Sequence, residues 1–362
     1  MKKIKSIPVY LLLIVLCSIY IVSCSEDSPV TPTDEPYQFD SARYDWSFQS
    51  FSTEFLTFDA FDTANIFLLG IRALVKYDGF NFNYNYYDDN SFYPLTMGSY
   101  DKNSIYIGGD DNSVSIDNGK PRLKRWNGST FDEIPIKDST NRHYQISAIQ
   151  AKSENEIWMG STRGDLIHYN NGSFEFLRID TTFIFTLFGT DEMGNFYSVA
   201  QKTVFDSLTS NYLNIYKKVN NTWDWTLVFS EKYTGYDINE IQPSRINSEI
   251  SGFKNNNIMK LTGNTFQEIF NIKPFIAYQI NQFSDSTINS FMLPGGNDNS
   301  GLKLFNWNGS KWSLEISFGK MNIFGDVFHK ISNVNGKYYF IYTDYLFGIT
   351  YFGKGKIKTI TN

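Results

Sequence analysis

The chain has 362 residues, and 17% of them are aromatic. It carries 38 acidic against 32 basic side chains; without the three lysines among the first five residues, 29 basic residues (32 − 3) remain, a net charge near −9 (29 − 38). An acidic chain without a basic stripe argues against nucleic acid and against anionic lipid as partners.

Residues 1–23 have the pattern of a bacterial signal peptide. Lysines precede an apolar run from Ile7 to Val22, which is short for a membrane-spanning helix and typical of a signal-peptide core. The run ends at Ile21-Val22-Ser23-Cys24, which resembles the lipobox of bacterial lipoproteins. The resemblance implies cleavage before Cys24 and a stable lipid anchor on this cysteine. The alternative is an ordinary signal peptide followed by an incidental cysteine.

Residues 24–43 are predicted to form a tether. Ser25-Glu26-Asp27-Ser28 resembles the export tag of surface lipoproteins from Bacteroidota-like bacteria, which implies an outer-membrane lipoprotein exposed on the cell surface. Attachment facing the periplasm stays open. Prolines mixed with Thr, Asp and Glu then predict an extended linker. The two cysteines, Cys17 and Cys24, leave the mature fold without a disulfide, so a hydrophobic core must stabilise it.

Residues 44–362 contain a pattern that recurs seven times, about every 46 residues. Each copy has a strand start, where polar residues precede a β-branched or aromatic run, and a later Asn-Gly-type turn before a bulky residue. The strand starts are at Asn65, Ser104, Glu156, Asn195, Glu249, Thr287 and Lys337, and the turns are at Asp78, Asn127, Asn171, Asn220, Thr262, Asn308 and Gly353. The period predicts an all-β, seven-bladed β-propeller of four-stranded antiparallel blades.

The third repeat indicates its four strands most clearly, at 146–149, 157–160, 166–169 and 174–177. Its segments Trp158-Met159-Gly160-Ser161 and Gly164-Asp165-Leu166 resemble the repeats of two-component-regulator propellers. That resemblance implies the propeller fold and a sensory or scaffold role rather than one chemistry. The segment 44–51 is an additional strand, which we expect to pair with the last blade and close the ring.

The interval from strand start to turn is longer in repeats 2, 4 and 6, which predicts longer connections there between the second and third strands. In propellers these connections share one face with the links between blades, where ligands often bind. Repeats 2 and 6 share the motif Gly-Gly-(Asp/Asn)-Asp-Asn-Ser, and repeat 4, at 201–211, lacks it. The candidate ligand-binding residues are Asp110, Asp111, Asn112, Asn297, Asp298 and Asn299.

These six side chains suit a sugar or a weak Ca²⁺ site, because both favour oxygen ligands. The alternative is that they are turn residues copied by duplication, since Gly, Asn and Asp favour turns. We predict no other cofactor and no metal ligands among the histidines; His168 is predicted to lie on a strand face. Arg163-Gly164-Asp165 spells a cell-adhesion tripeptide but lies where the third repeat needs a tight turn.

The sequence favours a non-enzymatic binding or scaffold module of the cell envelope, whose partner is a glycan or an envelope protein. Aromatic residues such as Tyr93, Tyr144 and Tyr236 are expected to offer stacking surfaces near the channel mouth. The alternative is a glycosidase or lyase of propeller fold. Such an enzyme needs an acid–base pair and cationic groups inside the channel.

Overall fold

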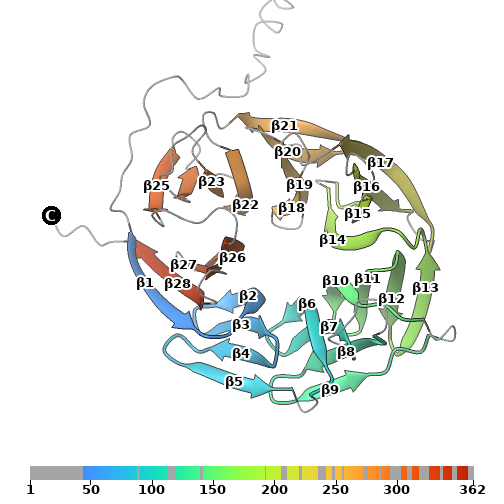
Figure 1. Ribbon diagram of the computed structural model, residues 1–362, viewed down its shortest axis with the longest axis horizontal. Coiled ribbons are helices and arrows are strands. Elements are labelled where there is room, and N and C mark those ends of the chain that lie inside the picture. The colour runs from blue at the N-terminus through green and yellow to red at the C-terminus, as the bar shows by residue number, and fades with distance from the viewer. Residues whose placement is uncertain are drawn as a thin grey trace, which may run out of the picture.

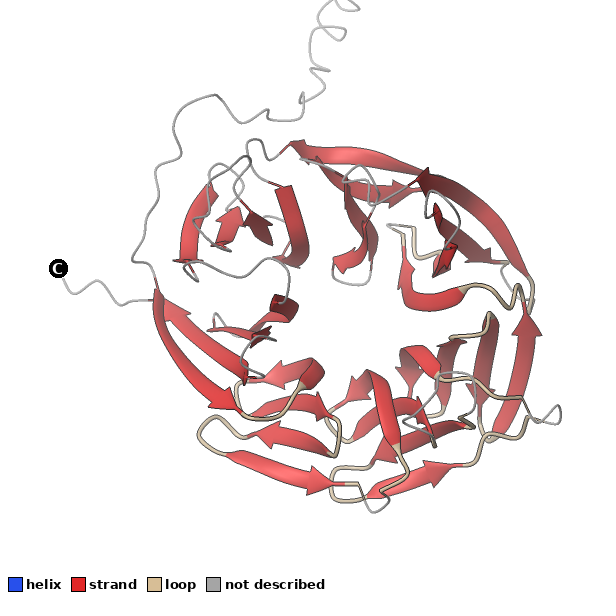
Figure 2. Ribbon diagram, viewed as in Figure 1, coloured by secondary structure: helices blue, strands red, loops and turns tan. Residues whose placement is uncertain are grey.

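The computed structural model describes residues 44–87, 90–111, 119–138, 142–191, 193–204, 210–219, 222–234, 242–246, 249–254, 257–271, 276–284, 287–293, 303–307, 312–317, 326–334, 337–344 and 349–357. All regular structure in these ranges is β-strand (Figure 2). The signal peptide, Cys24 and the tether lie outside them. Among the described residues, no helix has the length and apolar composition needed to cross a membrane.

The strands form small antiparallel sheets around a central axis, and within each sheet the strands follow one another outwards (Figure 1). In the described ranges five sheets have four strands, and the sixth has eight. The eight-stranded sheet consists of two antiparallel groups that are joined by one parallel pair, Thr190 with Glu249. The two groups therefore have little backbone pairing between them.

The strands have the following bounds. The first two sheets contain β2 (Phe55–Asp62), β3 (Asn65–Gly70), β4 (Ala73–Tyr77), β5 (Phe82–Tyr86), and β6 (Tyr93–Asp101), β7 (Ser104–Asp110), β8 (Pro121–Trp126), β9 (Phe131–Ile134). The next sheet contains β10 (Ile146–Ser153), β11 (Glu156–Ser161), β12 (Asp165–Asn170) and β13 (Ser173–Arg178). The eight-stranded sheet contains β14 (Ile184–Thr190), β15 (Phe196–Val204), β16 (Ser210–Lys218), β17 (Trp225–Thr234), β18 (Gln242–Ile246), β19 (Glu249–Lys254), β20 (Asn257–Thr262) and β21 (Thr265–Asn271). The last two sheets contain β22 (Ile276–Ser284), β23 (Thr287–Leu293), β24 (Lys303–Trp307), β25 (Trp312–Ser317), and β26 (Asp326–Val334), β27 (Lys337–Asp344), β28 (Ile349–Ile357) with β1 (Tyr44–Phe51).

The predicted strand starts are confirmed, because each coincides within one residue with the start of the second strand of a group, β3, β7, β11, β15, β19, β23 or β27. The four strands expected in the third repeat are confirmed as β10–β13. The hairpin turn at Asn171-Gly172 is confirmed as well: both residues have positive φ, 49° and 87°, as a type I′ turn requires.

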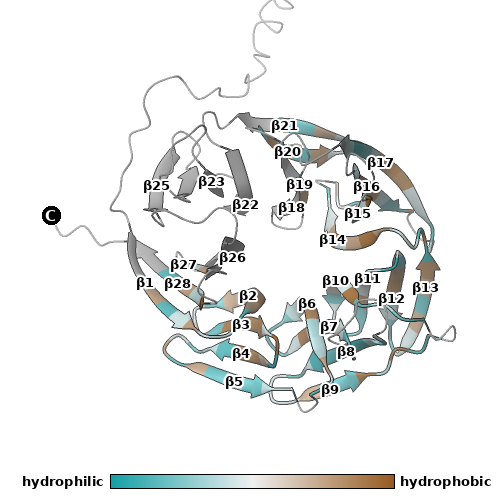
Figure 3. Ribbon diagram, in the orientation of Figure 1, coloured by the Kyte–Doolittle hydropathy of each residue, from teal (hydrophilic) through white to brown (hydrophobic). Residues whose placement is uncertain are grey.

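Second strands such as β3, β7 and β11 are buried on both sides, because neighbouring sheets pack face to face against them. In β3, Ile66 packs against the β26–β28 sheet, whereas the next residue, Phe67, packs against the β6–β9 sheet. This is why β3 and β11 have continuous apolar runs instead of alternation. The outer strand β5 is mostly exposed and mostly hydrophilic (Figure 3).

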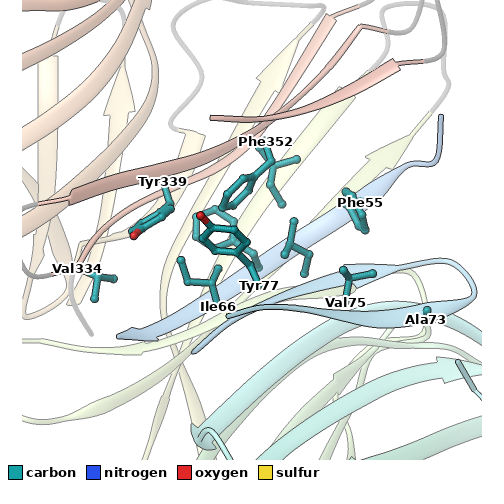
Figure 4. Close-up of a cluster of buried hydrophobic side chains, with 11 residues drawn as sticks. Phe55, Ile66, Ala73, Val75, Tyr77, Val334, Tyr339 and Phe352 are labelled. Carbon is teal, nitrogen blue, oxygen red and sulfur yellow. The ribbon is translucent and has the colours of Figure 1, made fainter. Parts of the chain in front are cut away.

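The N-terminal strand completes the C-terminal sheet, as predicted from the sequence. β1 pairs antiparallel with β28 from Tyr44 opposite Ile357 to Phe51 opposite Thr350. Side chains of the β2–β5 sheet, such as Ile66 and Tyr77, also pack against this sheet (Figure 4). Each such large side chain, when fully buried, contributes about 1.5–3 kcal/mol to stability.

Two expectations about connections are wrong. The turn expected at Gly353 is part of β28, because the partner of this strand is β1 and not a following hairpin strand. A side chain at Gly353 would clash with the ring of Phe340, which explains the glycine within a strand. The long loop expected at 201–211 is largely strand: β15 and β16 pair as far as Val204 opposite Ser210.

Candidate functional site

A pocket of about 500 Å³ opens between the β10–β13 sheet and the β14–β17 group. The pocket lies beside the β10–β11, β14–β15 and β16–β17 turns. These turns and the β7–β8 connection are on opposite faces of the ring of sheets. We call it the aromatic pocket, and its walls include Lys152, Glu156, Trp158, His168, Glu175, Phe196, Lys218 and Trp223.

Strand pairing builds one wall of the aromatic pocket. Trp158 on β11 lies opposite His168 on β12, and His168 lies opposite Glu175 on β13. Directly opposed residues point to the same face of a sheet, so these three side chains form a row. Lys152 and Glu156 lie on the same face of their strands and extend this row toward the β10–β11 turn.

Aromatic rings form the floor of the pocket. The rings of Trp158 and His168 stack with centroids 4.0 Å apart and an interplanar angle of 16°. Trp223, which comes from the β16–β17 turn, stacks on both, with centroids 5.4 Å from Trp158 and 5.7 Å from His168. Trp158 is only 2% exposed, whereas Trp223 is half-buried. Trp223 therefore presents the accessible aromatic surface.

The two carboxylates of the pocket are directed at these rings. Glu156 Oε1 accepts a hydrogen bond from the Trp158 indole N–H (3.1 Å) and lies 3.6 Å from His168 Nε2. Glu175 Oε2 lies 3.2 Å from His168 Nδ1. The side chain of Glu175 is mainly exposed, so its other oxygen is open to a ligand.

The two lysines lie over aromatic rings. Lys152 Nζ is 3.8 Å from the centroid of Phe196 and 5.7 Å from that of Trp158. Lys218 Nζ lies 5.5 Å from the Trp158 centroid and donates to the carbonyl of Thr222 (2.8 Å). Desolvation lowers the pKa of the Lys152 ammonium; Glu156 opposes this change and the charge of Lys218 adds to it.

A second cavity, of about 340 Å³, lies between the innermost strands β2, β6, β10 and β14. Ser99 donates a hydrogen bond to Asp59 at its wall, and Gln150 lies nearby. Asp59 is the only carboxylate, and no Lys or Arg is present, among the described residues that line this cavity. These residues do not supply the acid–base pair and cations that a propeller glycosidase needs.

The predicted loop residues have different environments. Asp110 ends β7, is fully buried, and accepts a hydrogen bond from Gln145 Nε2 (3.0 Å). Asp111 is exposed, and its carboxylate accepts the backbone N–H of Lys120 (2.7 Å), which closes the β7–β8 connection. Asn112, Asn297, Asp298 and Asn299 lie outside the described residues. Ligand binding by these six residues stays a prediction.

A metal site needs several ligand side chains close together. Among the described residues, no three His, Cys, Asp or Glu side chains come together as metal ligands. Because four of the six loop residues lie outside these ranges, the weak Ca²⁺ site also stays a prediction.

The Arg-Gly-Asp tripeptide forms a tight turn, as expected from the sequence. Gly164 has a φ of 72°, and Asp165 is fully buried. The Asp165 carboxylate accepts hydrogen bonds from Arg142 Nη1 (2.7 Å) and from Arg178 Nε and Nη2 (3.0 and 3.1 Å). This carboxylate is a structural element of the fold and is not accessible to a receptor.

One predicted stacking residue is wrong and another lies outside the described ranges. Tyr144 has no exposed surface, because it packs in the core between the β6–β9 and β10–β13 sheets. Tyr93 is half-buried at the start of β6, and Tyr236 is not among the described residues. His168 lies on a strand face, as predicted, but that face is the wall of the aromatic pocket.

Sequence reasoning missed the aromatic pocket. Trp158 and Phe196 appeared only as apolar residues at strand starts, and Trp223 only as the bulky residue after a turn. A usable signal was present in the charged residues at 152, 156 and 218, which lie at or near strand ends next to an apolar residue. This pattern does not predict which neighbouring sheet the three charged side chains face.

Comparisons with known proteins identify the fold. No family model and no curated protein matches the chain. It is similar to the structure of YCF48 bound to D1 peptide (TM-score 0.59, 12% identity, 90% of this chain and 100% of that chain) and to YCF48 from Cyanidioschyzon merolae (0.57, 13%, 85% and 98%). It is also similar to the WD40 domain of Neurospora crassa Pan2 (0.54, 10%, 90% and 99%). At these identities the similarity concerns the fold alone, and together with the four-stranded antiparallel sheets it makes the protein a β-propeller.

Proposed function

We propose that this protein is a seven-bladed propeller that is lipid-anchored through Cys24 to the outer membrane, exposed on the cell surface, and active as a non-enzymatic binding module. The blade count is supported by the single parallel pair within the eight-stranded sheet, which divides it naturally into two blades. The lipobox-like Ile21-Val22-Ser23-Cys24 supports the anchor.

The observation that carries the binding function is the aromatic pocket. It combines an accessible indole, Trp223, with two ammonium groups and two carboxylates in one concave site. Pockets with a few convergent polar groups on an aromatic surface are typical ligand sites. We propose a glycan or an envelope protein as the partner; the similar YCF48 structure bound to D1 peptide is a precedent for a ligand on this fold.

We also propose the connections that carry Asp110, Asp111, Asn112, Asn297, Asp298 and Asn299 as a secondary contact surface on the opposite face. The support is the motif shared by two distant repeats. The buried, hydrogen-bonded Asp110 holds the connection in place, and the exposed Asp111 carboxylate offers oxygen atoms to a ligand.

The test is thermal unfolding of the mature, lipid-anchored protein in detergent with a panel of neutral and acidic oligosaccharides, together with capture of proteins from envelope extracts. A ligand at about 100 times its Kd adds about 2.7 kcal/mol, which raises the unfolding midpoint by about 4 °C. We expect Trp223→Ala to abolish the shift or the capture.

The matched control is Tyr86→Ala, which removes a 65% exposed aromatic from the outer strand of another sheet. This variant should bind like the wild type. Binding that survives in Trp223→Ala would assign the ligand to another surface, and the absence of any ligand or partner would refute the binding module itself.

A further inference from the structure

The charges of the aromatic pocket are not mutually satisfied. Glu156 and Glu175 are both directed at His168, and Glu156 also accepts the Trp158 N–H. Neither Lys152 nor Lys218 has a carboxylate within ion-pair distance among the described residues; Lys218 donates only to backbone carbonyls. The two ammonium groups therefore remain available to an anion.

Both ammonium groups flank one indole. Lys152 Nζ and Lys218 Nζ lie 5.7 and 5.5 Å from the Trp158 centroid. Desolvation lowers the pKa of Lys152, and repulsion from Lys218 adds to this change, whereas Glu156 opposes it. An anion bound between them would relieve this repulsion. The faces of the aromatic rings alone would favour a cation, but the two ammonium groups favour a carboxylate, which accepts charge-assisted hydrogen bonds from them.

Trp223 and Glu175 indicate which other chemical groups the anion carries. Trp223 offers a flat apolar surface, and apolar ring faces stack on such surfaces. The open carboxylate of Glu175 accepts hydrogen bonds from hydroxyl groups. A pyranose that bears a carboxylate has all three complements, namely an apolar C–H face, hydroxyl donors and a negative charge.

We propose that the aromatic pocket binds an acidic oligosaccharide, with a uronate ring stacked on Trp223 and its carboxylate between Lys152 and Lys218. This inference rests on the proposed binding function and narrows it to one class of ligand. The pocket volume of about 500 Å³ is large enough for more than one sugar ring.

The experiment is isothermal titration calorimetry of the full mature protein with a short oligogalacturonate and with its methyl ester, which keeps the rings and removes the charge. We expect the acid form to bind at least about tenfold more tightly than the ester, because one charge-assisted contact contributes about that factor. Binding of the acid form should also weaken as salt is added.

Lys152→Gln and Lys218→Gln should each weaken binding of the acid form by about tenfold and leave the ester unaffected. The matched control is Lys76→Gln, since Lys76 Nζ also lies over a ring, 5.7 Å from the Phe67 centroid, but in the β2–β5 sheet. It should change neither affinity. Unfolding midpoints of all variants verify that they are folded.

Equal binding of acid and ester, or binding that is insensitive to both lysines, would overturn the inference. If Trp223→Ala then abolished binding of both sugars, the protein would still be a glycan-binding module. If neither sugar bound and a captured envelope protein depended on Trp223, the acidic ligand would be refuted while the binding function stood. Failure of both experiments would refute both proposals.

Discussion

At the scale of single residues, carboxylates organise the turns of this protein. Asp191 directly follows the inner strand β14 and accepts hydrogen bonds from the backbone N–H groups of Met193 and Asn195, the Asn195 amide and the Tyr197 hydroxyl. Burial acts to raise the pKa of the Asp191 carboxyl, but these hydrogen bonds outweigh it and hold the pKa below the usual 3.8. The charged form of Asp191 therefore stabilises the folded state.

This stabilisation predicts a pH dependence. Because the pKa of Asp191 is lower in the folded than in the unfolded protein, its contribution is complete above about pH 4 and is lost as the pH falls through the folded value. Asp191→Asn should lower the free energy of unfolding by about 1–3 kcal/mol at neutral pH, and the difference from wild type should shrink toward about pH 3. Urea denaturation at the two pH values measures it.

The control for this prediction is Asp224→Asn, at an exposed position of the same group whose side chain makes no hydrogen bond to a described residue. Its effect should be small at both pH values. If the difference in unfolding free energy between Asp191→Asn and the wild type is the same at both pH values, the charge of Asp191 does not contribute to stability. That result would contradict the pKa argument.

At the scale of elements, the N-terminal strand β1 completes the C-terminal sheet. β1 covers the outer edge of β28 from Thr350 to Ile357. The ring of Phe51 packs edge-on against those of Phe55 and Phe82, with centroid distances of 5.1 and 4.9 Å. Without β1, the backbone groups of β28 would be an unpaired edge, which invites pairing between molecules.

Deletion of residues 44–51 from the mature chain should therefore destabilise the propeller. Loss of the Phe51 ring alone costs about 3 kcal/mol, and the loss of strand pairing adds to it. We expect a clearly lower thermal midpoint and aggregation, as measured by calorimetry and light scattering. A chain that begins at Tyr44 is the control and should unfold like the wild type. Equal midpoints of the two chains would show that β1 does not close the ring.

Some strand boundaries depend on local sequence and others on distant strand partners. Strand starts such as Glu156 and the type I′ turn at Asn171-Gly172 were predictable because polar turn residues and alternating side chains act over a few positions. The end of β28 was not predictable from its Gly-Lys-Gly-Lys composition, because its strand partner lies more than 300 positions earlier in the chain. Likewise, only pairing with β16 extends β15 to Val204.

At the scale of the whole molecule, anchoring and folding should be separable, because the described fold begins at Tyr44, well beyond Cys24. Cys24→Ser should move the protein from the membrane to the soluble fraction and leave its thermal midpoint unchanged. Cell fractionation and calorimetry measure the two effects. Cys17→Ser, inside the predicted signal peptide, is the matched control and should remain with the membrane. A Cys24→Ser protein that still sediments with membranes would refute the lipid anchor.

That this chain is built from repeated antiparallel strands follows from the amino-acid sequence alone, because the period, the turns and the apolar runs are properties of neighbouring residues. The sequence also singled out Asp110 and Asp111, but not that one is buried and the other exposed. The position of the aromatic pocket, by contrast, depends on how the sheets pack together. Lys152 and Trp158 belong to one sheet and Trp223 to the next, and they meet because adjacent sheets pack face to face. Which residues face each other across that interface depends on the twist and register of both sheets, which no local pattern specifies.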